Sequence, residues 1–396
     1  MAKVKILRIL NRFNIGGPVY NALYLTKFLD KVKYDTFLIG GMCEPHEQSA
    51  KLLLNNQGIV FKQLNYMRRS FSLFYDIISL IEVIKLIYQY RPDIIHTHAA
   101  KAGFIGRLAS FFYFREVKVV HTFHGNVFQG YFSKIKTKFI LFIERFLAKK
   151  TDKIIAISEL QKNDLVLKFL ISDEKKIQII PLGFDLKIFS EISEAKRKLN
   201  REIFKIENST VLITIIGRVV PIKNHKFFID VFNYCRNRTN TKIKALVVGD
   251  GDEINNVINH AKKYNLKISY KKITDDYDIL FTSWRSDIDN ILSATDISCL
   301  TSISEGTPVS IIESMASGTV CISSDVGGVS DLIDNGINGL ICNLDVNQFG
   351  KKLIKLIDNK LFRDKLSKYG QTDSLKYYNY NVLTKNMDNL YSSIIR

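Results

Sequence analysis

The chain has 396 residues, more than a single hydrophobic core normally supports, so its length predicts two domains. Hydrophobic residues make up 46% of it, which excludes a disordered protein, and no uninterrupted apolar run reaches transmembrane length, since Phe139–Leu147 is broken by Glu144 and Arg145. The formal net charge of +18 excludes an acidic protein and points to an anionic partner: nucleic acid, an anionic lipid surface or a phosphorylated substrate.

The positive charge is concentrated in the first half. Residues 1–190 hold 29 Lys or Arg against 15 Asp or Glu, whereas residues 191–396 hold 28 against 24. A lysine-rich proteome would also explain this bias. The five cysteines are scattered without CxxC or metal-ligand spacing, and Met1–Leu7 predicts a short buried strand rather than a signal peptide. We therefore expect a cytoplasmic protein.

Apolar runs with strand character alternate with helical patterns through residues 1–190. The helical pattern is clearest in Leu73–Gln89, where apolar residues recur at helical spacing and Pro92 follows as a stop, and Tyr20–Leu29 is a second predicted helix. The predicted strands are Val4–Leu10, Tyr34–Ile39, Ile94–His96, Lys118–Thr122 and Lys153–Ala156. This alternation predicts parallel α/β layers.

A more polar stretch, Phe189–Thr210, separates this series from a second one. The second series is predicted to contain the strands Val211–Ile216, Ala245–Val248, Ile297–Leu300 and Val320–Ser323. The chain ends in Tyr380–Arg396, which is apolar at helical spacing. The fold class is therefore α/β, with two Rossmann-like domains in tandem, at 1–190 and 191–375, facing a cleft. The helix 376–396 is expected to pack back toward the first domain.

Ligands of open parallel sheets bind at the carboxyl ends of the strands, so the residues that follow each strand are candidates for the site. Gly16 and Gly17 lie in the turn after the first strand, where glycines let backbone N–H groups approach a phosphate, although a plain tight turn would explain them equally. Lys101 follows Ile94–His96, where a cation is unfavourable at a helix start unless it has a task. A solvated surface would explain it too.

His124 lies beside a glycine just after the strand Lys118–Thr122, where a residue that contacts a ligand belongs. A lone histidine is more often structural, and His121, on the strand itself, is predicted to be one. In the second half, Arg218 and Lys223 flank a proline turn after Val211–Ile216. Paired cations there can clamp a diphosphate, although two solvated charges would explain them as well.

The stretch Ile303–Glu313 places two carboxylates, Glu305 and Glu313, around the start of a predicted helix. Thr307 is suited to cap this helix, Pro308 to occupy its first position, and Gly318 to end it. A helix start binds phosphate readily, and the flanking acids are suited to sugar hydroxyls. An ordinary capped helix with Glu313 on a solvated face is the alternative. No His, Asp or Glu cluster has metal-ligand spacing, and Asp250–Asp252 is predicted to be a surface turn.

Taken together, these segments resemble the retaining GT-B glycosyltransferases of family four, the bacterial group that builds surface polysaccharides. The resemblance covers nearly the whole chain and is strongest in Glu305–Glu313 with Ala316–Gly318, Gly217–Lys223 and Asp325–Asp331. The stretch from His121–Gly125 to Gly130–Ser133 resembles the subgroup that acts on lipid-linked sugars. Each motif alone is weak, but their order at successive strand ends is specific.

The resemblance implies roles for the candidate residues. Arg218 and Lys223 would hold the donor diphosphate, Glu305 the donor sugar hydroxyls, and Glu313 the ribose hydroxyls. His124 would lie near the donor sugar and face the acceptor. The remaining implied contacts are donor binding by Gly16, Gly17, Trp284, Arg285, Gly306, Thr307 and Pro308, and acceptor binding by Lys101 and Asn126. Ser283 stands where many relatives carry glycine, so the nucleobase loop Thr282–Arg285 departs from the family pattern.

The implied activity is transfer of a hexosyl or N-acetylhexosaminyl group, with retention, from a nucleotide sugar to a hydroxyl acceptor. UDP is favoured over GDP, and the expected acceptor is a polyprenyl-diphosphate-linked sugar in capsule, O-antigen or exopolysaccharide synthesis. Preorganised cations would remove the need for a metal, so no metal or other cofactor is expected. We expect an anionic inner-membrane surface as a partner and no nucleic acid. The alternatives are a UDP-sugar 2-epimerase and a non-catalytic basic binding protein.

Overall fold

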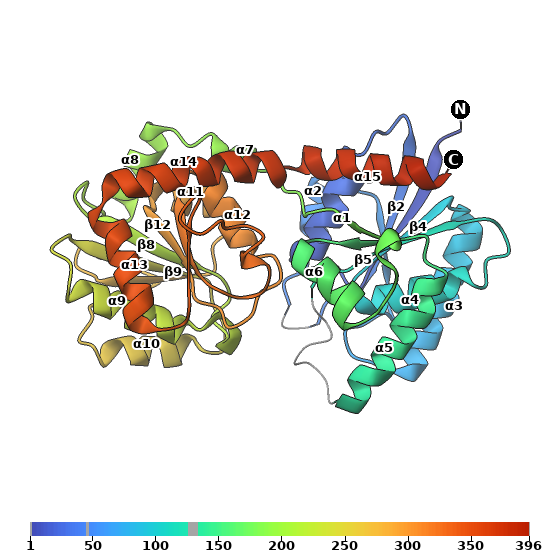
Figure 1. Ribbon diagram of the computed structural model, residues 1–396, viewed down its shortest axis with the longest axis horizontal. Helices are drawn as coiled ribbons and strands as arrows, with labels where there is room; N and C mark the ends of the chain where they lie inside the picture. Colours follow the sequence, from blue (N-terminus) through green and yellow to red (C-terminus); the bar gives the residue numbers. More distant parts are fainter. Residues whose placement is uncertain (1, 45–46, 126–133, 396) are drawn as a thin grey trace. The chain divides into compact units, whose positions relative to one another are not determined.

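A computed structural model describes residues 2–44, 47–125 and 134–395. It divides the chain into two compact units: unit 1 comprises Met1–Asp185 and Tyr378–Arg396, and unit 2 comprises Leu186–Tyr377. Each unit holds one seven-stranded sheet in which every pairing is parallel, with helices on both faces (Figure 1). This confirms the α/β class.

The sheet of unit 1 has the order β3-β2-β1-β4-β5-β6-β7. Its strands are β1 (Val4–Leu10), β2 (Tyr34–Gly41), β3 (Phe61–Leu64), β4 (Ile94–His98), β5 (Lys118–Thr122), β6 (Lys153–Ala156) and β7 (Ile177–Ile179). Its helices are α1 (Gly17–Phe28), α2 (Lys51–Asn56), α3 (Leu73–Tyr90), α4 (Ala100–Ser110), α5 (Lys134–Lys149), α6 (Glu159–Asn163) and α15 (Tyr380–Ile395). A π-helical turn, Asp164–Lys168, follows α6.

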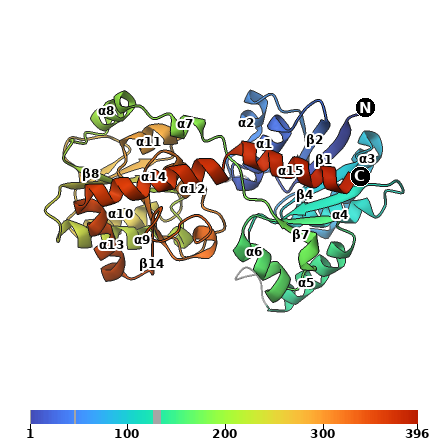
Figure 2. The same cartoon turned by 45° about the horizontal axis from the view of Figure 1, so that its top comes forward.

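Two helical layers enclose the sheet of unit 1. On one face, α3 and α4 pack on a core that includes Leu7, Ile9 and Ile95. On the other face, α15 lies along α1, as both views show, and its Leu383 and Tyr391 join the core with Ile6 (Figure 2). The last helix of the chain therefore completes the same core as the first strand.

The sheet of unit 2 has the order β10-β11-β9-β8-β12-β13-β14. Its strands are β8 (Val211–Ile216), β9 (Ile243–Val248), β10 (Ile268–Tyr270), β11 (Ile279–Ser283), β12 (Ile297–Leu300), β13 (Val320–Ser324) and β14 (Leu340–Cys342). Its helices are α7 (Lys187–Ser190), α8 (Glu194–Ile203), α9 (His225–Arg236), α10 (Ile254–Lys262), α11 (Ile288–Ala294), α12 (Val309–Ala316), α13 (Val346–Asp358) and α14 (Lys360–Tyr377). Short 3₁₀ turns occur at Glu174–Lys176 in unit 1 and at Pro221–Lys223 and Gly327–Val329 in unit 2.

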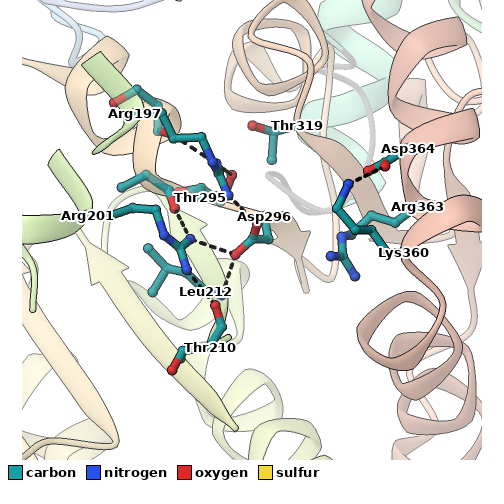
Figure 3. A network of polar contacts seen from close by, with 12 residues as sticks. Arg197, Arg201, Thr210, Leu212, Thr295, Asp296, Thr319, Lys360, Arg363 and Asp364 are labelled. Carbon is teal, nitrogen blue, oxygen red and sulfur yellow. Dashed lines mark hydrogen bonds and ion pairs between the residues drawn. The ribbon is translucent and has the colours of Figure 1, made fainter. Parts of the chain in front are cut away.

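Charged side chains fasten helix α8 to the amino ends of the strands in unit 2. Arg197 and Arg201 of α8 both point at Asp296, which precedes β12 (Figure 3). The Asp296 carboxylate accepts hydrogen bonds from Arg197 Nη2 at 2.6 Å, Arg201 Nη1 at 3.0 Å and the Leu212 N–H at 2.8 Å. This edge of the sheet is thus closed by a saturated ionic network, opposite the edge where ligands of such sheets bind.

Each strand predicted from the sequence is present, with ends that differ by no more than two residues. Prediction missed the strands β3, β7, β10, β11 and β14, of which all but β11 have three or four residues. The polar stretch Phe189–Thr210 contains the helix α8. Among the residues that the structure describes, no helix is both long enough and apolar enough to span a bilayer.

Candidate active site

The carboxyl ends of β8 and β12 bring the predicted donor-binding residues of unit 2 together. Lys223 Nζ lies 2.5 Å from Glu305 Oε1, and both side chains are largely buried. Ser302 Oγ donates to the same carboxylate oxygen at 2.5 Å. Residues 82 positions apart in the chain therefore form one charged pair at the edge of the sheet where ligands of this fold class bind.

Backbone contacts hold the two loops that carry this pair in register. The Ile303 N–H donates to the Ile222 carbonyl at 2.8 Å, and Thr301 Oγ1 donates to the carbonyls of Lys223 and Asn224, each at 3.2 Å. These contacts do not involve the charged groups themselves, so they hold the two loops together in addition to the Lys223–Glu305 pair.

A second glycine turn supports the Glu305 loop from below. Gly327 has φ +52, and a Cβ placed on it would lie 1.8 Å from the Glu305 carbonyl oxygen. The Gly328 N–H donates to the Gly306 carbonyl at 2.9 Å, and a Cβ on Gly328 would lie 2.3 Å from that oxygen. Only glycine fits at both positions, which explains the Asp325–Asp331 motif as a support for Glu305 and Gly306.

Arg218 is exposed, and among the described residues no acidic side chain pairs with it. The aliphatic part of Lys223 lies over Gly217, where a Cβ would be 3.7 Å from Lys223 Cε. The turn after β8 therefore presents a free guanidinium and an ammonium that is shared with one carboxylate. Such a pair is suited to an anionic group with several oxygens.

Glu313 is the fifth of the eight residues of α12 and is half-buried. Burial raises the pKa of its carboxyl to about 8, and no side chain among the described residues pairs with it. The predicted start of this helix was wrong by one residue: α12 begins at Val309, Pro308 is its N-cap, and no side chain caps it, so Thr307 does not do so. Pro308 has an extended ψ of 107°, which keeps it outside the helix. Gly318, with φ +72, ends the helix as predicted.

The loop after β11 shows why the family pattern has glycine at position 283. Ser283 adopts a left-handed φ of +61 and is held there by a 2.5 Å hydrogen bond from its Oγ to Asp250 Oδ2. Beyond it, Trp284 is half exposed, and Arg285 forms a two-point ion pair with Asp287 at 2.7 and 2.6 Å. Serine therefore occupies a left-handed position that favours glycine, and the Trp284 side chain next to it is half exposed to solvent.

In unit 1, Gly16 and Gly17 form the start of α1, as the predicted phosphate turn requires. A Cβ on Gly16 or Gly17 would meet its nearest neighbour at 3.7 or 3.9 Å, which is ordinary contact. Protein neighbours thus do not require glycine at either position. Close approach of a ligand to the backbone is the remaining physical reason for it.

Lys101 lies in the first turn of α4, but its ammonium is engaged. It contacts Asp76 Oδ1 at 2.5 Å and donates to the Ser70 carbonyl at 2.6 Å, and both side chains of the ion pair are nearly buried. Its predicted contact with an acceptor must therefore use its third N–H. Asn126 falls outside the described residues.

His124 follows β5 and belongs to a buried polar seam that sequence reasoning missed. Its Nε2 lies 2.9 Å from Nδ1 of His98, at the end of β4. Below this pair, Arg8 Nη1 lies 2.9 Å from His96 Nδ1, and Tyr391 OH lies 2.6 Å from the same nitrogen. Two features of the sequence could have indicated this seam. One is Arg8 inside the apolar strand Val4–Leu10, and the other is the spacing of His96 and His98, which places both side chains on one face of a strand.

Burial keeps these histidines neutral. Desolvation lowers the pKa of His124 to about 3. It lowers the pKa of His96 well below the ordinary value together with the Arg8 guanidinium, and that of His98 together with His96, His124 and, to a smaller degree, Arg8. His121, on the opposite face, bonds Thr97 Oγ1 at 2.8 Å and is fully buried, which confirms its predicted structural role. Unit 1 thus offers hydrogen-bonding groups rather than histidine charge at this edge.

Comparison with known proteins decides what the two sites belong to. Residues 15–188 match the family model "Glycosyltransferase Family 4" and residues 196–373 match "Glycosyl transferases group 1". An Escherichia coli protein named UDP-Gal:alpha-D-GlcNAc-diphosphoundecaprenol alpha-1,3-galactosyltransferase is 33% identical over 299 residues, covering 74% of this chain and 73% of that protein. The chain belongs to glycosyltransferase family 4.

Three further matches cover this family 4 glycosyltransferase almost completely. A Campylobacter jejuni N,N'-diacetylbacillosaminyl-diphospho-undecaprenol alpha-1,3-N-acetylgalactosaminyltransferase is 24% identical over 96% of this chain and 97% of that protein. The crystal structure of Anabaena HepE in complex with UDP superposes with a TM-score of 0.81 at 19% identity, covering 98% of this chain and 100% of that one. A Rickettsia africae glycosyltransferase gives the same TM-score at 20% identity, covering 100% of each chain. The fold is GT-B.

Proposed function

We propose that this glycosyltransferase moves a hexosyl or N-acetylhexosaminyl group, with retention, from a UDP-sugar to a hydroxyl of a polyprenyl-diphosphate-linked sugar during capsule, O-antigen or exopolysaccharide synthesis. The observation that carries the proposal is the Lys223–Glu305 pair beside the exposed Arg218 at the carboxyl edge of unit 2. The Escherichia coli and Campylobacter jejuni relatives support the acceptor class, and the names of the former and of the UDP complex of Anabaena HepE support UDP.

Unit 2 supplies the groups that a nucleotide-sugar donor needs. Arg218 and Lys223 neutralise the diphosphate, and their positive charge stabilises the negative charge that grows on it as the sugar leaves. Glu305, fixed by Ser302 and Lys223, accepts hydrogen bonds from the donor sugar hydroxyls. Glu313 binds the ribose hydroxyls, and Trp284 and Arg285 border the nucleobase. Gly306, Thr307 and Pro308 shape the turn between the two acids.

Unit 1 supplies contacts to the diphosphate and to the acceptor. The N–H groups at Gly16 and Gly17 begin α1, where the helix dipole favours an anion. His124 contacts the donor sugar and the acceptor, and Lys101 and Asn126 contact the acceptor. Since the cations and N–H groups offset the charge of the leaving diphosphate, we propose that transfer needs no metal.

Retention is proposed to proceed without a covalent intermediate on the protein. The acceptor oxygen bonds to the anomeric carbon on the face from which the diphosphate leaves, as the bond from that carbon to phosphate oxygen breaks. The acceptor proton passes to the departing phosphate oxygen. The oxocarbenium character of the sugar resembles that in glycoside hydrolysis, but neither Glu305 nor Glu313 is assigned as a nucleophile.

The test is a donor panel. Purified protein is incubated with UDP- and GDP-sugars, with and without a polyprenyl-diphosphate-linked sugar, and released nucleotide is measured, with and without EDTA. We expect release from one UDP-sugar that depends on the acceptor, survives EDTA, and yields a product with an α-anomeric proton coupling. Release from no donor by wild-type protein would refute transfer, and a β-linked product from an α-linked donor would refute retention.

We also propose that the face of unit 1 carrying α5 binds an anionic membrane. Among the side chains of α5, Ile135 is 83%, Phe139 62% and Phe142 68% exposed. The adjacent Lys136 and Lys138 are exposed as well, while Glu144 anchors the helix by a buried ion pair with Arg107 at 2.5 Å. A helix that is fixed on one face and apolar and basic on the other is typical of interfacial binding.

Flotation with vesicles tests this surface. We expect binding to vesicles that contain anionic lipid, little binding to neutral ones, and a loss of roughly 10³-fold in Phe139→Ser/Phe142→Ser, because each buried Phe contributes about 2 kcal/mol. Leu361→Ser is the matched control, since Leu361 on α14 in unit 2 is 84% exposed. Equal binding of the double variant and the wild type would refute the membrane surface.

A further inference from the structure

The carboxyl ends of β4 and β5 hold two histidine rings against each other. His98 is the last residue of β4 and fully buried, and His124 follows β5 by two residues. Their ring centroids lie 5.2 Å apart with an interplanar angle of 28°, and His98 Nδ1 lies 2.9 Å from His124 Nε2. One of these two nitrogens carries the shared proton and the other accepts it.

We propose that His98 is a positioning residue that donates its Nδ1–H to His124 Nε2 and thereby holds His124 as the tautomer that presents Nδ1–H to a substrate oxygen. The inference rests on the proposed function, in which His124 touches the donor sugar and the acceptor. It adds an identified residue that sets which hydrogen bond His124 can make.

The direction of the shared hydrogen bond follows from the groups beneath it. Arg8 is fully buried, has only N–H donors, and leaves its Nε and Nη2 without partners among the described residues. His98 Nε2 is likewise buried without a partner. A lone pair on that nitrogen is favoured in the field of a guanidinium, so the proton of neutral His98 lies on Nδ1 and points to His124.

The neighbouring His96 shows the same ordering by Arg8. Arg8 Nη1 can only donate, so His96 Nδ1 accepts, and the proton of neutral His96 lies on Nε2. That proton is donated to Thr122 Oγ1 at 2.8 Å. Arg8 thus determines which ring nitrogen of His96 carries the proton through a direct hydrogen bond, and which nitrogen of His98 does so through its electric field.

His124 Nδ1 is the free end of this arrangement. It has no hydrogen-bond partner among the described residues, although the His124 side chain as a whole is partly exposed. A buried ring nitrogen without a partner is costly, and a substrate oxygen at this position would remove the cost. With the proton on Nδ1, His124 donates to that oxygen without carrying charge.

The experiment compares two substitutions at position 98. The amide nitrogen of His98→Asn occupies the place of Nδ1 and can donate to His124, whereas His98→Leu cannot. We expect His98→Leu to lower kcat at least tenfold with the donor KM within about twofold of the wild type, and His98→Asn to stay within about threefold in kcat. An equal loss in both variants, or no loss in His98→Leu, would overturn the proposal.

The matched control is His121→Leu. His121 is as buried as His98 and also has one unpaired ring nitrogen, but it bonds Thr97 on the other face of the sheet. We expect His121→Leu to lower the melting temperature as much as His98→Leu while kcat stays within about twofold. A kcat loss in His121→Leu equal to that of His98→Leu would show a general structural effect and overturn the assignment.

A spectroscopic measurement separates this inference from the proposed function. In ¹⁵N-histidine-labelled protein without substrate, we expect His124 as the Nδ1–H tautomer in the wild type and His98→Asn, and as the Nε2–H tautomer in His98→Leu. The same His124 tautomer in His98→Leu as in the wild type would overturn the positioning role. If the wild type released no nucleotide from any sugar, transfer would fail, yet the tautomer shift would still support the positioning role.

Discussion

The two units present opposite chemistry at equivalent edges of two similar sheets. In unit 2, the turn after β8 carries an exposed Arg218 and a Lys223 shared with Glu305. In unit 1, the ends of β4 and β5 carry a fully buried His98 and a partly exposed His124, both with a pKa lowered by desolvation. Unit 2 therefore offers fixed charge, which suits a leaving diphosphate. Unit 1 offers directed hydrogen bonds, which suit a neutral hydroxyl.

The largest expected effect is loss of the charge in unit 2. Lys223→Met and Glu305→Gln should each lower nucleotide release by roughly 10²–10³-fold, because one preorganised electrostatic contact to the transition state is removed. The double variant should lose less than the product of the two factors, since the residues act as one unit. Lys226→Met is the control, because Lys226 lies three residues after Lys223, in the first turn of α9, and pairs with Glu253 instead. A matching loss in Lys226→Met would contradict a specific role.

Low pH should destabilise unit 1 through its buried histidines. His96, His98, His121 and His124 all have a pKa lowered by burial, so the unfolded chain binds protons near pH 6.5 where the folded unit does not. The free energy of unfolding of unit 1 should fall as pH drops below about 6.5, by roughly 1.4 kcal/mol per pH unit for each histidine. Hydrogen exchange in β4 and β5 between pH 7 and pH 5 measures it.

Unit 2 provides the internal control for that experiment. It holds one buried histidine of this kind, His225, with a pKa lowered to about 4, and one carboxyl, Glu313, with a pKa raised to about 8. The raised carboxyl binds a proton in the folded state between pH 4.5 and 8, so its contribution to stability grows on acidification. Equal acid sensitivity of β8 and β4 would contradict the contrast between the units.

The parts predictable from the sequence were those carried by local pattern. Continuous apolar runs located the strands, a period of 3.6 located α3, and the Gly217–Lys223 and Glu305–Glu313 motifs located the charged pair. The seam of Arg8, His96, His98 and Tyr391 could not be predicted, because its residues come from two separate strands and the last helix. Short strands such as β7 and β14 were missed because three residues carry no period. The start of α12 was misjudged because Thr307 has the residue type of a cap without its geometry.

A structural charge should behave differently from the charges of the site. Asp296→Ala leaves Arg197 and Arg201 without their carboxylate and should destabilise unit 2 by about 3 kcal/mol. The melting temperature should fall by roughly 10 °C, while kcat below the transition stays within about twofold. Thermal unfolding and nucleotide release measure the two effects. A large kcat loss in folded protein would show that the amino edge of this sheet communicates with the catalytic edge.

Substitution of Glu313 should change both donor binding and the stability of unit 2. At pH 9, where the Glu313 carboxyl is charged, Glu313→Gln should raise the donor KM about tenfold, because a charge-assisted bond to the ribose hydroxyls becomes a neutral one. It should also stabilise unit 2 at pH 9 by about 2 kcal/mol and change little at pH 5, since only the charged form suffers from burial. Melting temperatures at the two pH values test the sign. A loss of stability at pH 9 would place a stabilising partner on the carboxylate.

The smallest effect concerns Ser283, where this chain departs from the glycine of its relatives. Ser283→Ala and Ser283→Gly both lose the hydrogen bond to Asp250, but only glycine relieves the left-handed φ of +61. Glycine should therefore exceed alanine in stability by about 1 kcal/mol, with nucleotide release equal in both. Urea unfolding at constant slope measures the difference. An alanine variant as stable as the glycine variant would show that the left-handed φ at position 283 causes no measurable strain. The only contribution of the serine side chain to stability would then be its hydrogen bond to Asp250.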